Sequence, residues 1–217
     1  MQFHTDDGLL DVEINTLTIA GWTGRDAAGV QHHIDELKAI GVPPPTHVPL
    51  FYKVSASLLV QSHTVQALGE ETSGEAEPFL LRANDVLWLG VASDHTDRGL
   101  EATSVAHSKQ VCAKPVANRL WCFDEVADRL DSLQLSSTIE EGGIRVAYQN
   151  GTLDAIRPLV ELLERNALGE GDAMLCGTLP AIGGVRPSAK FQMALSDPAN
   201  GRSIEASYGV QSLPVIA

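Results

Sequence analysis

Short apolar stretches of strand length recur along most of this chain, and they constrain its fold more than any other feature. They alternate apolar and polar residues or form brief continuous apolar runs, as half-buried and fully buried strands do. Gly, Pro, Asn and Asp separate several of them, which is typical of turns. The predicted strands are residues 9–20 with a turn near Asn15, 48–60, 64–68, 76–81, 85–91, 173–176, 191–195 and 204–210.

Helical periodicity is limited to a few segments. Between residues 25 and 40, Val30, Ile34 and Leu37 recur at helical spacing, and Gly41 with the prolines at 43–45 ends the pattern. Three further segments have weaker helical patterns. They are residues 100–108, 124–133 and 153–165. Strands with few helices predict an α+β domain built on a strand-rich roll or sandwich.

The size and composition suit one compact domain. The chain has 217 residues, of which 44% are hydrophobic and 20% charged, and this is ordinary globular composition. No internal repeat or linker divides it, so we expect a single domain over residues 1–217. The three cysteines are too scattered for a disulfide framework, and we interpret them as small buried side chains in a reducing compartment.

Charge narrows the class of partner. The formal net charge is −13 and no cluster of Lys or Arg interrupts the acidity, which argues against nucleic acid and anionic membranes as partners. No apolar run approaches the length of a membrane span, and the first residues lack the pattern of a secretion signal. We therefore expect a cytoplasmic protein whose partners are small molecules or metal cations.

Three carboxylates form a candidate metal site. Glu75 and Glu77 are two positions apart, so a strand places both on one face. Two like charges side by side need a positive partner, and a divalent cation with oxygen ligands would supply it. Asp94, at the end of a later predicted strand, could add a third ligand. The alternative is an exposed acidic strand face.

A histidine and a glutamate form a candidate base dyad. His33 lies close to the apolar stripe of the helix predicted over residues 25–40, and Glu36 follows it by three positions. The carboxylate could orient the imidazole and support its charge when it takes a proton. The alternative is a boundary histidine beside a solvated glutamate.

A basic segment offers an anion site. Lys109 and Lys114 flank small and apolar residues in an otherwise acidic chain, and Lys109 could bind a substrate carboxylate or a developing oxyanion. Both lysines could equally be surface cations. Cys112 between them is a further candidate nucleophile, although no histidine is placed to activate it.

In chain order, these segments resemble the fumarylacetoacetate hydrolase superfamily. The residues that form the motifs resemble an uncharacterised branch of it. No single motif is specific, whereas the ordered set spans residues 21–180. The set comprises residues 21–25, His33-x-x-Glu36, Phe51-Tyr52-Lys53, Glu75-x-Glu77, Ser93-Asp94-x-x-x-Arg98, Lys109 with Pro115, and Gly177-Thr178-Leu179-Pro180.

The resemblance implies a metal-dependent enzyme acting on a small oxo acid or 1,3-dicarbonyl compound. It implies a roll or sandwich with a short lid helix, a homodimer, and Mg²⁺ or Mn²⁺ as cofactor. The implied metal ligands are Glu75, Glu77 and Asp94. The implied catalytic residues are His33, Glu36 and Lys109, and the implied binding residues for an anionic substrate are Lys53, Arg98, Glu101 and Thr178.

Three departures from the family pattern alter the expected pocket. Ser93 stands where Asn is usual, Leu179 interrupts a Gly-Thr-Pro turn, and Glu101 replaces a Gln that commonly helps bind an oxyanion. A carboxylate at that position opposes negative charge unless it is protonated or bound elsewhere. Only 17 positions separate Glu77 from Asp94, which is short for the family, and Asp97 is the substitute ligand if Asp94 is displaced.

The reaction stays open at this stage. Hydrolysis of a carbon–carbon bond is favoured, and hydration, decarboxylation or isomerisation could follow from the same enolate-like intermediate. A rival of another class is a non-catalytic domain that binds a small molecule and is stabilised by a metal, with Ca²⁺ on the acidic strand face. Metal-free hydrolysis through Cys112 is a third alternative.

Overall fold

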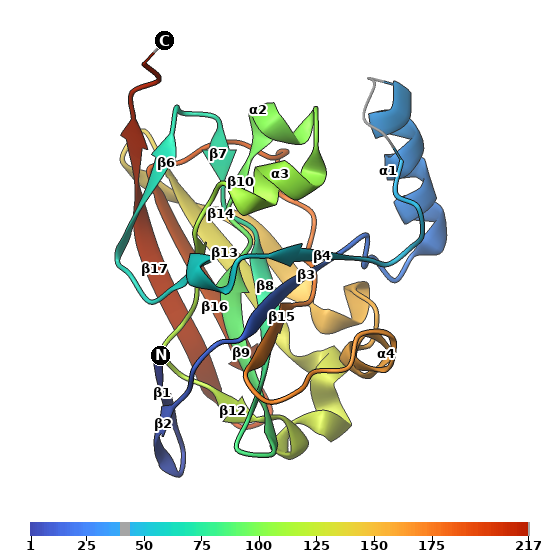
Figure 1. The fold of residues 1–217 in the computed structure, drawn as a ribbon, viewed down its shortest axis with the longest axis vertical. Helices are drawn as coiled ribbons and strands as arrows, with labels where there is room; N and C mark the ends of the chain where they lie inside the picture. The colour runs from blue at the N-terminus through green and yellow to red at the C-terminus, as the bar shows by residue number, and fades with distance from the viewer. Residues whose placement is uncertain (40–43, 217) are drawn as a thin grey trace.

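The computed structural model describes residues 1–39 and 44–216 and shows two mixed sheets packed face to face (Figure 1). The first sheet has six strands in the order β12, β9, β8, β15, β3 and β4. Their bounds are Trp121–Cys122, Val86–Ser93, Ala76–Ala83, Asp172–Leu175, Thr16–Gly21 and Leu50–Val54. All neighbours are antiparallel except β15 and β3.

The second sheet has five strands in the order β14, β13, β16, β17 and β6. Their bounds are Ile144–Thr152, Gln134–Glu141, Lys190–Asp197, Arg202–Leu213 and Thr64–Leu68. Only β17 and β6 are parallel. Burial alternates along β16, as expected for a sheet with one face on the core and one on solvent. The predicted strand-rich α+β sandwich is therefore confirmed.

The six-stranded sheet is covered on both faces. Leu80 and Leu89 pack with residues of the five-stranded sheet in one core cluster. Phe79 and Leu81 belong to a second cluster on the opposite face, together with Phe3. Because side chains alternate along a strand, burial on both faces makes β8 almost continuously buried.

Three two-stranded ladders complete the strands. They are β1 (Gln2–Thr5) with β2 (Gly8–Asp11), β7 (Thr72–Ser73) with β10 (Thr96–Asp97), and β5 (Leu59–Val60) with β11 (Lys114–Pro115). The β1–β2 hairpin covers the second core cluster through Phe3 and Leu10. Strand β7 precedes β8 and strand β10 follows β9 in the chain, so the candidate residues Glu75 and Asp94 lie between the β7–β10 ladder and these two strands.

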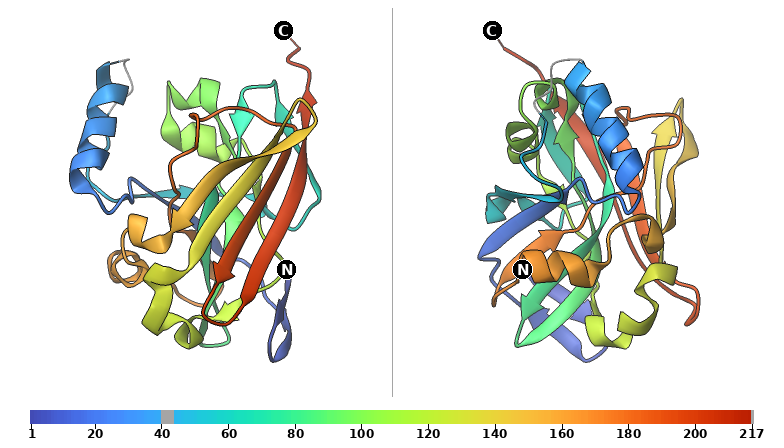
Figure 2. Two further views of the ribbon diagram at one scale, coloured as in Figure 1. Left: turned by 180° about the vertical axis from the view of Figure 1, so that it is seen from behind. Right: turned by 90° about the vertical axis from the view of Figure 1, so that its right-hand side faces the viewer.

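The helices are short and lie around the sheets (Figure 2). The α-helices are α1 (Ala27–Ala39), α2 (Arg98–Glu101), α3 (Val105–Gln110) and α4 (Leu159–Arg165), and the 3₁₀ turns are η1 (Ala56–Leu58), η2 (Phe123–Glu125), η3 (Ala127–Ser132) and η4 (Leu153–Ala155). Helix α1 stands at one side of the molecule, at the same end as α2 and α3 (Figure 1).

Three helix predictions need correction. The segment 153–165 forms a 3₁₀ turn and then α4, because Pro158 cannot continue a helix from the preceding turn. Residues 124–133 form 3₁₀ turns instead of an α-helix. Residues 100–108 divide into the end of α2 and most of α3, where the side chain of Ser104 caps α3 by accepting from the His107 amide.

No helix among the described residues is long and apolar enough to cross a membrane.

Candidate metal and substrate site

The pairing of β8 with β9 brings the candidate metal ligands together. Ala76 faces Ser93 in the register, and the Asp94 amide donates to the Glu75 carbonyl at 2.9 Å. One carboxylate oxygen each from Glu75, Glu77 and Asp94 lies within 4.8 Å of the others. Among the side chains that the structure describes, which exclude those of His33 and Glu36, this is the one group of three or more His, Cys, Asp or Glu residues with such spacing.

Glu77 is held by the turn that follows β15. Its side chain is buried, and Oε2 accepts a hydrogen bond from the Gly177 amide at 2.7 Å. Burial, reinforced by the nearby Asp94, raises the pKa of Glu77 well above its ordinary value. Gly177 has φ of 99°, and a Cβ there would lie 1.6 Å from Thr23 Oγ1, so this turn requires glycine.

Asp94 is fully buried between two lysines. Lys109 of α3 donates to Asp94 Oδ2, and Lys114 Nζ lies 3.0 Å from Oδ1. Burial alone would raise the pKa of Asp94, yet the two ammonium groups bring it below its ordinary value. Lys114 is itself completely buried and also donates to the His95 carbonyl. The sequence analysis predicts a functional role for Lys109 and none for Lys114.

Arg98 of α2 has three partners around the cluster. Its Nε donates to Ser73 Oγ at 2.7 Å, Nη1 donates to Glu101 Oε2 at 2.8 Å, and Nη2 lies 3.3 Å from Glu75 Oε1. Burial opposes its charge, but Glu75 and Glu101 raise the pKa of the guanidinium above its ordinary value. Arg98 and Glu101, both predicted to bind substrate, are therefore bound to each other.

A buried glutamine from the second sheet holds the strand segment between the two glutamates. Gln149 of β14 accepts from the Ala76 amide at 2.9 Å through Oε1 and donates to the Leu179 carbonyl at 2.8 Å through Nε2. Thr178 donates from its hydroxyl to the Ala76 carbonyl at 2.8 Å and also contacts Gln149. Thr178 thus borders the cluster, and its hydroxyl is used to fix Ala76.

A second buried network fixes the residues on either side of Asp94. The Tyr208 hydroxyl of β17 lies 2.8 Å from Ser93 Oγ and 3.0 Å from His95 Nδ1, and His95 Nε2 lies 2.9 Å from Thr72 Oγ1. Burial and the neighbouring cations, Lys114 first, lower the pKa of His95 to about 3. The neutral imidazole is therefore favoured, and it connects β17 of the five-stranded sheet to the β7–β10 ladder.

The remaining predicted site residues lie elsewhere. Lys53 of β4 donates to Thr18 Oγ1 at 2.6 Å and to Asn166 Oδ1 at 3.2 Å, and it has no recorded contact with the carboxylate cluster. His33 and Glu36 have their backbone in α1, and their side chains lie outside the part of the chain that the structure describes. Asp97, the substitute ligand, instead caps α2 by accepting from the Leu100 amide at 2.9 Å.

The donor set fits a hard divalent cation. Carboxylate oxygens are the ligands that Mg²⁺, Mn²⁺ and Ca²⁺ prefer. Asp94 Oδ1 is buried, and its nearest partner is the Lys114 ammonium at 3.0 Å. A carboxylate oxygen has more than one lone pair, so Oδ1 could also face a metal cation. Glu75, Glu77 and Asp94 are the residues that would hold such an ion.

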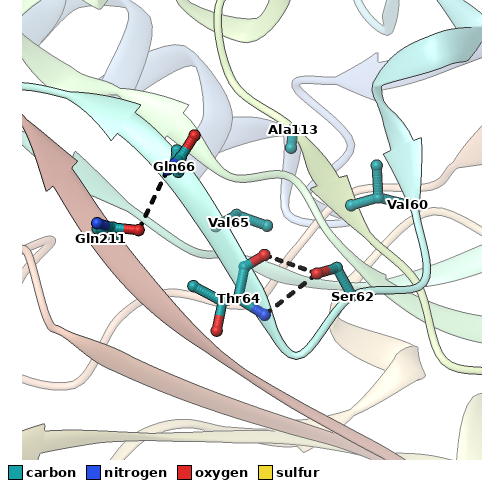
Figure 3. A pocket seen from close by; sticks show the side chains of 7 residues that line it. All are labelled: Val60, Ser62, Thr64, Val65, Gln66, Ala113 and Gln211. Atoms are coloured by element: carbon teal, nitrogen blue, oxygen red, sulfur yellow. Dashed lines mark hydrogen bonds between the residues drawn. The ribbon is translucent and has the colours of Figure 1, made fainter.

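A separate hollow beside β6 has no comparable chemistry. It has a volume of about 440 Å³, and its polar contacts join Gln66 to Gln211 at 3.2 Å and Ser62 to Thr64 (Figure 3). The lining residues are Val60, Ser62, Thr64, Val65, Gln66, Ala113 and Gln211. None of these side chains is acidic, basic or nucleophilic enough for the chemistry considered above.

Solved structures share this architecture. A protein assigned as a fumarylpyruvate hydrolase from Burkholderia cenocepacia matches with a TM-score of 0.67 at 18% identity, over 98% of this chain and 95% of that chain. The protein Cg1458 matches with a TM-score of 0.64 at 12% identity, over 93% and 78%. A 2-keto-3-deoxy-D-arabinonate dehydratase complexed with magnesium and 2,5-dioxopentanoate matches with a TM-score of 0.61 at 14% identity, over 94% and 75%.

At these identities the structural matches establish the fold. No curated protein sequence matches the chain. A family model described as "Protein of unknown function (DUF2848)" matches residues 20–208, which is most of the chain. The expected fold is therefore confirmed by its likeness to a structure assigned as a fumarylpyruvate hydrolase and to a 2-keto-3-deoxyarabinonate dehydratase, and the chain belongs to the DUF2848 family.

Proposed function

We propose that this protein is a metal-dependent enzyme that acts on a small oxo acid or 1,3-dicarbonyl compound, with hydrolysis of a carbon–carbon bond as its reaction. The observation that carries the proposal is the convergence of Glu75, Glu77 and Asp94 within 4.8 Å. Three carboxylates so close repel one another strongly in a buried setting, and this favours a bound divalent cation.

Two structural neighbours support the substrate class. One is assigned as a fumarylpyruvate hydrolase, and another contains magnesium together with 2,5-dioxopentanoate, whose name describes an oxo acid. A hydrolase and a dehydratase on one fold support a common substrate class more strongly than a common reaction. Hydration, decarboxylation and isomerisation are therefore the alternatives to hydrolysis.

The candidate metal ligands and catalytic residues each have a role in the proposed reaction. Glu75, Glu77 and Asp94 hold the cation, and Mg²⁺ or Mn²⁺ bound there supplies Lewis-acid polarisation of a substrate carbonyl. Lys109 keeps its positive charge beside Asp94 and stabilises negative charge on the substrate. His33, oriented by Glu36, takes a proton from water or from a carbon next to the carbonyl.

Calorimetric titration with oxalate, an oxo-acid enolate mimic, tests the proposal. With Mn²⁺ present we expect oxalate to bind, and with the metal removed by a chelator we expect no binding. Glu77→Gln should abolish both Mn²⁺ and metal-dependent oxalate binding, since it removes one oxygen charge from the set. Glu164→Gln removes an exposed carboxylate of α4 and is the matched control.

The outcomes separate the enzyme from its rivals. Mn²⁺ binding without any effect on oxalate would favour a non-catalytic, metal-stabilised domain. Oxalate binding that survives chelation would contradict the metal-dependent mechanism. Once a substrate is found, His33→Ala should lower kcat by about 100-fold or more with Mn²⁺ affinity unchanged, and unchanged turnover would remove His33 from its proposed role.

A further inference from the structure

The guanidinium of Arg98 is already paired with carboxylates. Nε and Nη1 donate to Ser73 and Glu101 at 2.7 and 2.8 Å, and Nη2, which makes no hydrogen bond, lies 3.3 Å from Glu75 Oε1. Two of these partners are carboxylates, so the positive charge of Arg98 is compensated locally. A substrate carboxylate that approached Arg98 would have to compete with the carboxylate of Glu101. Glu101 follows Arg98 by three positions in α2, so the helix already places it beside the guanidinium.

A ligand that enters the carboxylate cluster from solvent passes the ion pair of Arg98 and Glu101. The side chains of Lys109, Lys114 and Asp94 are exposed by 8%, 0% and 0%. Glu75 and Arg98 are each exposed by 18%, and Glu101 by 30%. The cluster is therefore open to solvent on the side where Glu75, Arg98 and Glu101 lie. The part of a substrate that is not held at the carboxylates extends toward solvent along that side.

The charges around the site limit what can lie there. When a divalent cation holds Glu75, Glu77 and Asp94 as carboxylates, the nearby ionised groups are these three, the carboxylate of Glu101, and the cations Arg98, Lys109 and Lys114. Four negative and three positive charges leave −1, and a divalent cation brings the total to +1. Asp97, which caps α2, would only make the total more negative. One substrate carboxylate brings the total charge of the metal-bound site to zero. A second substrate carboxylate has no uncompensated cation to pair with.

Glu101 and Lys109 share a neighbour, Tyr52. Both are near enough to Tyr52 of β4 to influence its phenol electrostatically, and Lys109 Nζ lies 5.8 Å from the centre of the Tyr52 ring. Lys109 lies at the cluster itself, bound to Asp94, so Glu101 is the group whose charge a substrate chain would meet on leaving the cluster.

We propose that Glu101 is a specificity-determining residue that makes the site select 2-oxo acids with a single carboxylate and reject those with a second one. The inference rests on the proposed function. Removing the Glu101 charge frees Arg98 and converts the same site into one that accepts a second carboxylate, because opposite charges in a partly buried site attract strongly.

Two ligands of equal chain length test this selectivity. 2-Oxopentanoate carries one carboxylate, and 2-oxoglutarate differs from it by a second carboxylate at the far end. Titrated into the Mn²⁺-loaded protein, 2-oxopentanoate should bind about tenfold tighter than 2-oxoglutarate. In Glu101→Gln the ratio should fall to about one or reverse, mainly because 2-oxoglutarate gains affinity. Glu164→Gln should leave the ratio unchanged.

The result distinguishes this inference from the proposed function. If oxalate and 2-oxopentanoate bind with metal but 2-oxoglutarate binds as tightly in the unaltered protein, the specificity role of Glu101 is overturned and the metal site stands. An unchanged ratio in Glu101→Gln overturns it as well. If none of the three ligands binds the metal-loaded protein, the proposed function and the inference both fail.

Discussion

Two buried carboxylates of this protein each lie between two cations, and only one of them belongs to the candidate site. Asp197 at the end of β16 lies 3.0 Å from Arg129 and 3.5 Å from Arg202, whose side chains are exposed by 21% and 26%. Asp94 at the end of β9 lies between Lys109 and Lys114, which are almost completely buried.

The two carboxylates differ in their charged neighbours. Asp197 receives hydrogen bonds from Arg129 and Asn200, and the second arginine stacks over Trp121 with its Cζ 4.7 Å from the ring centre. Its partners border an open surface hollow of about 460 Å³. Asp94 lies beside two further carboxylates, Glu75 and Glu77. A single carboxylate between two arginines is matched by their charge, whereas three converging carboxylates offer the oxygen ligands of a divalent cation.

The largest expected effect is on metal affinity. Asp94→Asn should weaken Mn²⁺ binding by more than about 100-fold, because even partners outside the ligand shell contribute 10–100-fold. Asp197→Asn should leave Mn²⁺ affinity within about twofold. Both variants should unfold at lower denaturant concentration, since each leaves buried or half-buried cations without a carboxylate. Calorimetry and urea unfolding monitor the two effects separately. Equal Mn²⁺ affinity in the two variants would show that Asp94 binds the metal no more than Asp197 does.

An intermediate effect is expected at Gln149, which acts through the backbone of Ala76. Gln149→Ala should weaken Mn²⁺ binding by about tenfold, because the spacing of Glu75 and Glu77 is no longer fixed. Gln66→Ala, which removes a surface glutamine paired with Gln211, is the control. If Gln149→Ala lowers the unfolding midpoint and leaves Mn²⁺ affinity unchanged, Gln149 serves the fold alone.

The smallest effect concerns Asp197 and acidity. Arg129, helped by Asn200, lowers the pKa of Asp197 to about 2. A folded-state pKa below the unfolded value of about 3.9 contributes stability above that value, and the contribution is lost as the pH falls toward 2. Urea unfolding of the unaltered protein between pH 4 and 2 should therefore show a decline that is shallower in Asp197→Asn. Parallel curves would show that Asp197 does not titrate in this range.

Strands with a clear pattern were predictable, and those fixed by turns less so. The apolar run over 76–81 falls within β8, and the run over 85–91 overlaps β9 except for its first residue. The β13–β14 hairpin escaped prediction, although Gly142 and Gly143 both have positive φ, at 57° and 81°, in its two-residue turn. A Gly-Gly pair between alternating segments was the available signal. The apolar periodicity of residues 153–165 predicts one helix, because the pattern gives Pro158 no weight. In the structure Pro158 caps the start of α4, and the residues before it are not part of that helix.

The site was predictable where its chemistry is local. Glu75 and Glu77 share a face because strand side chains alternate, and the structure places their oxygens close to Asp94 as expected. Lys114 and Gln149 reach the site through contacts between segments distant in sequence, and a lone Lys or Gln in a sequence carries no sign of such contacts. Glu101 was recognised as out of place, and its pairing with Arg98 shows where its charge goes.

The most direct test of the account is a diffraction experiment on crystals soaked in Mn²⁺, measured to reveal the anomalous scattering of manganese. The account predicts one strong peak in contact with oxygens of Glu75, Glu77 and Asp94, and no such peak in Glu77→Gln crystals. A peak at Asp197 or elsewhere on the acidic surface, with the carboxylate cluster still closed by Lys109 and Lys114, would contradict it.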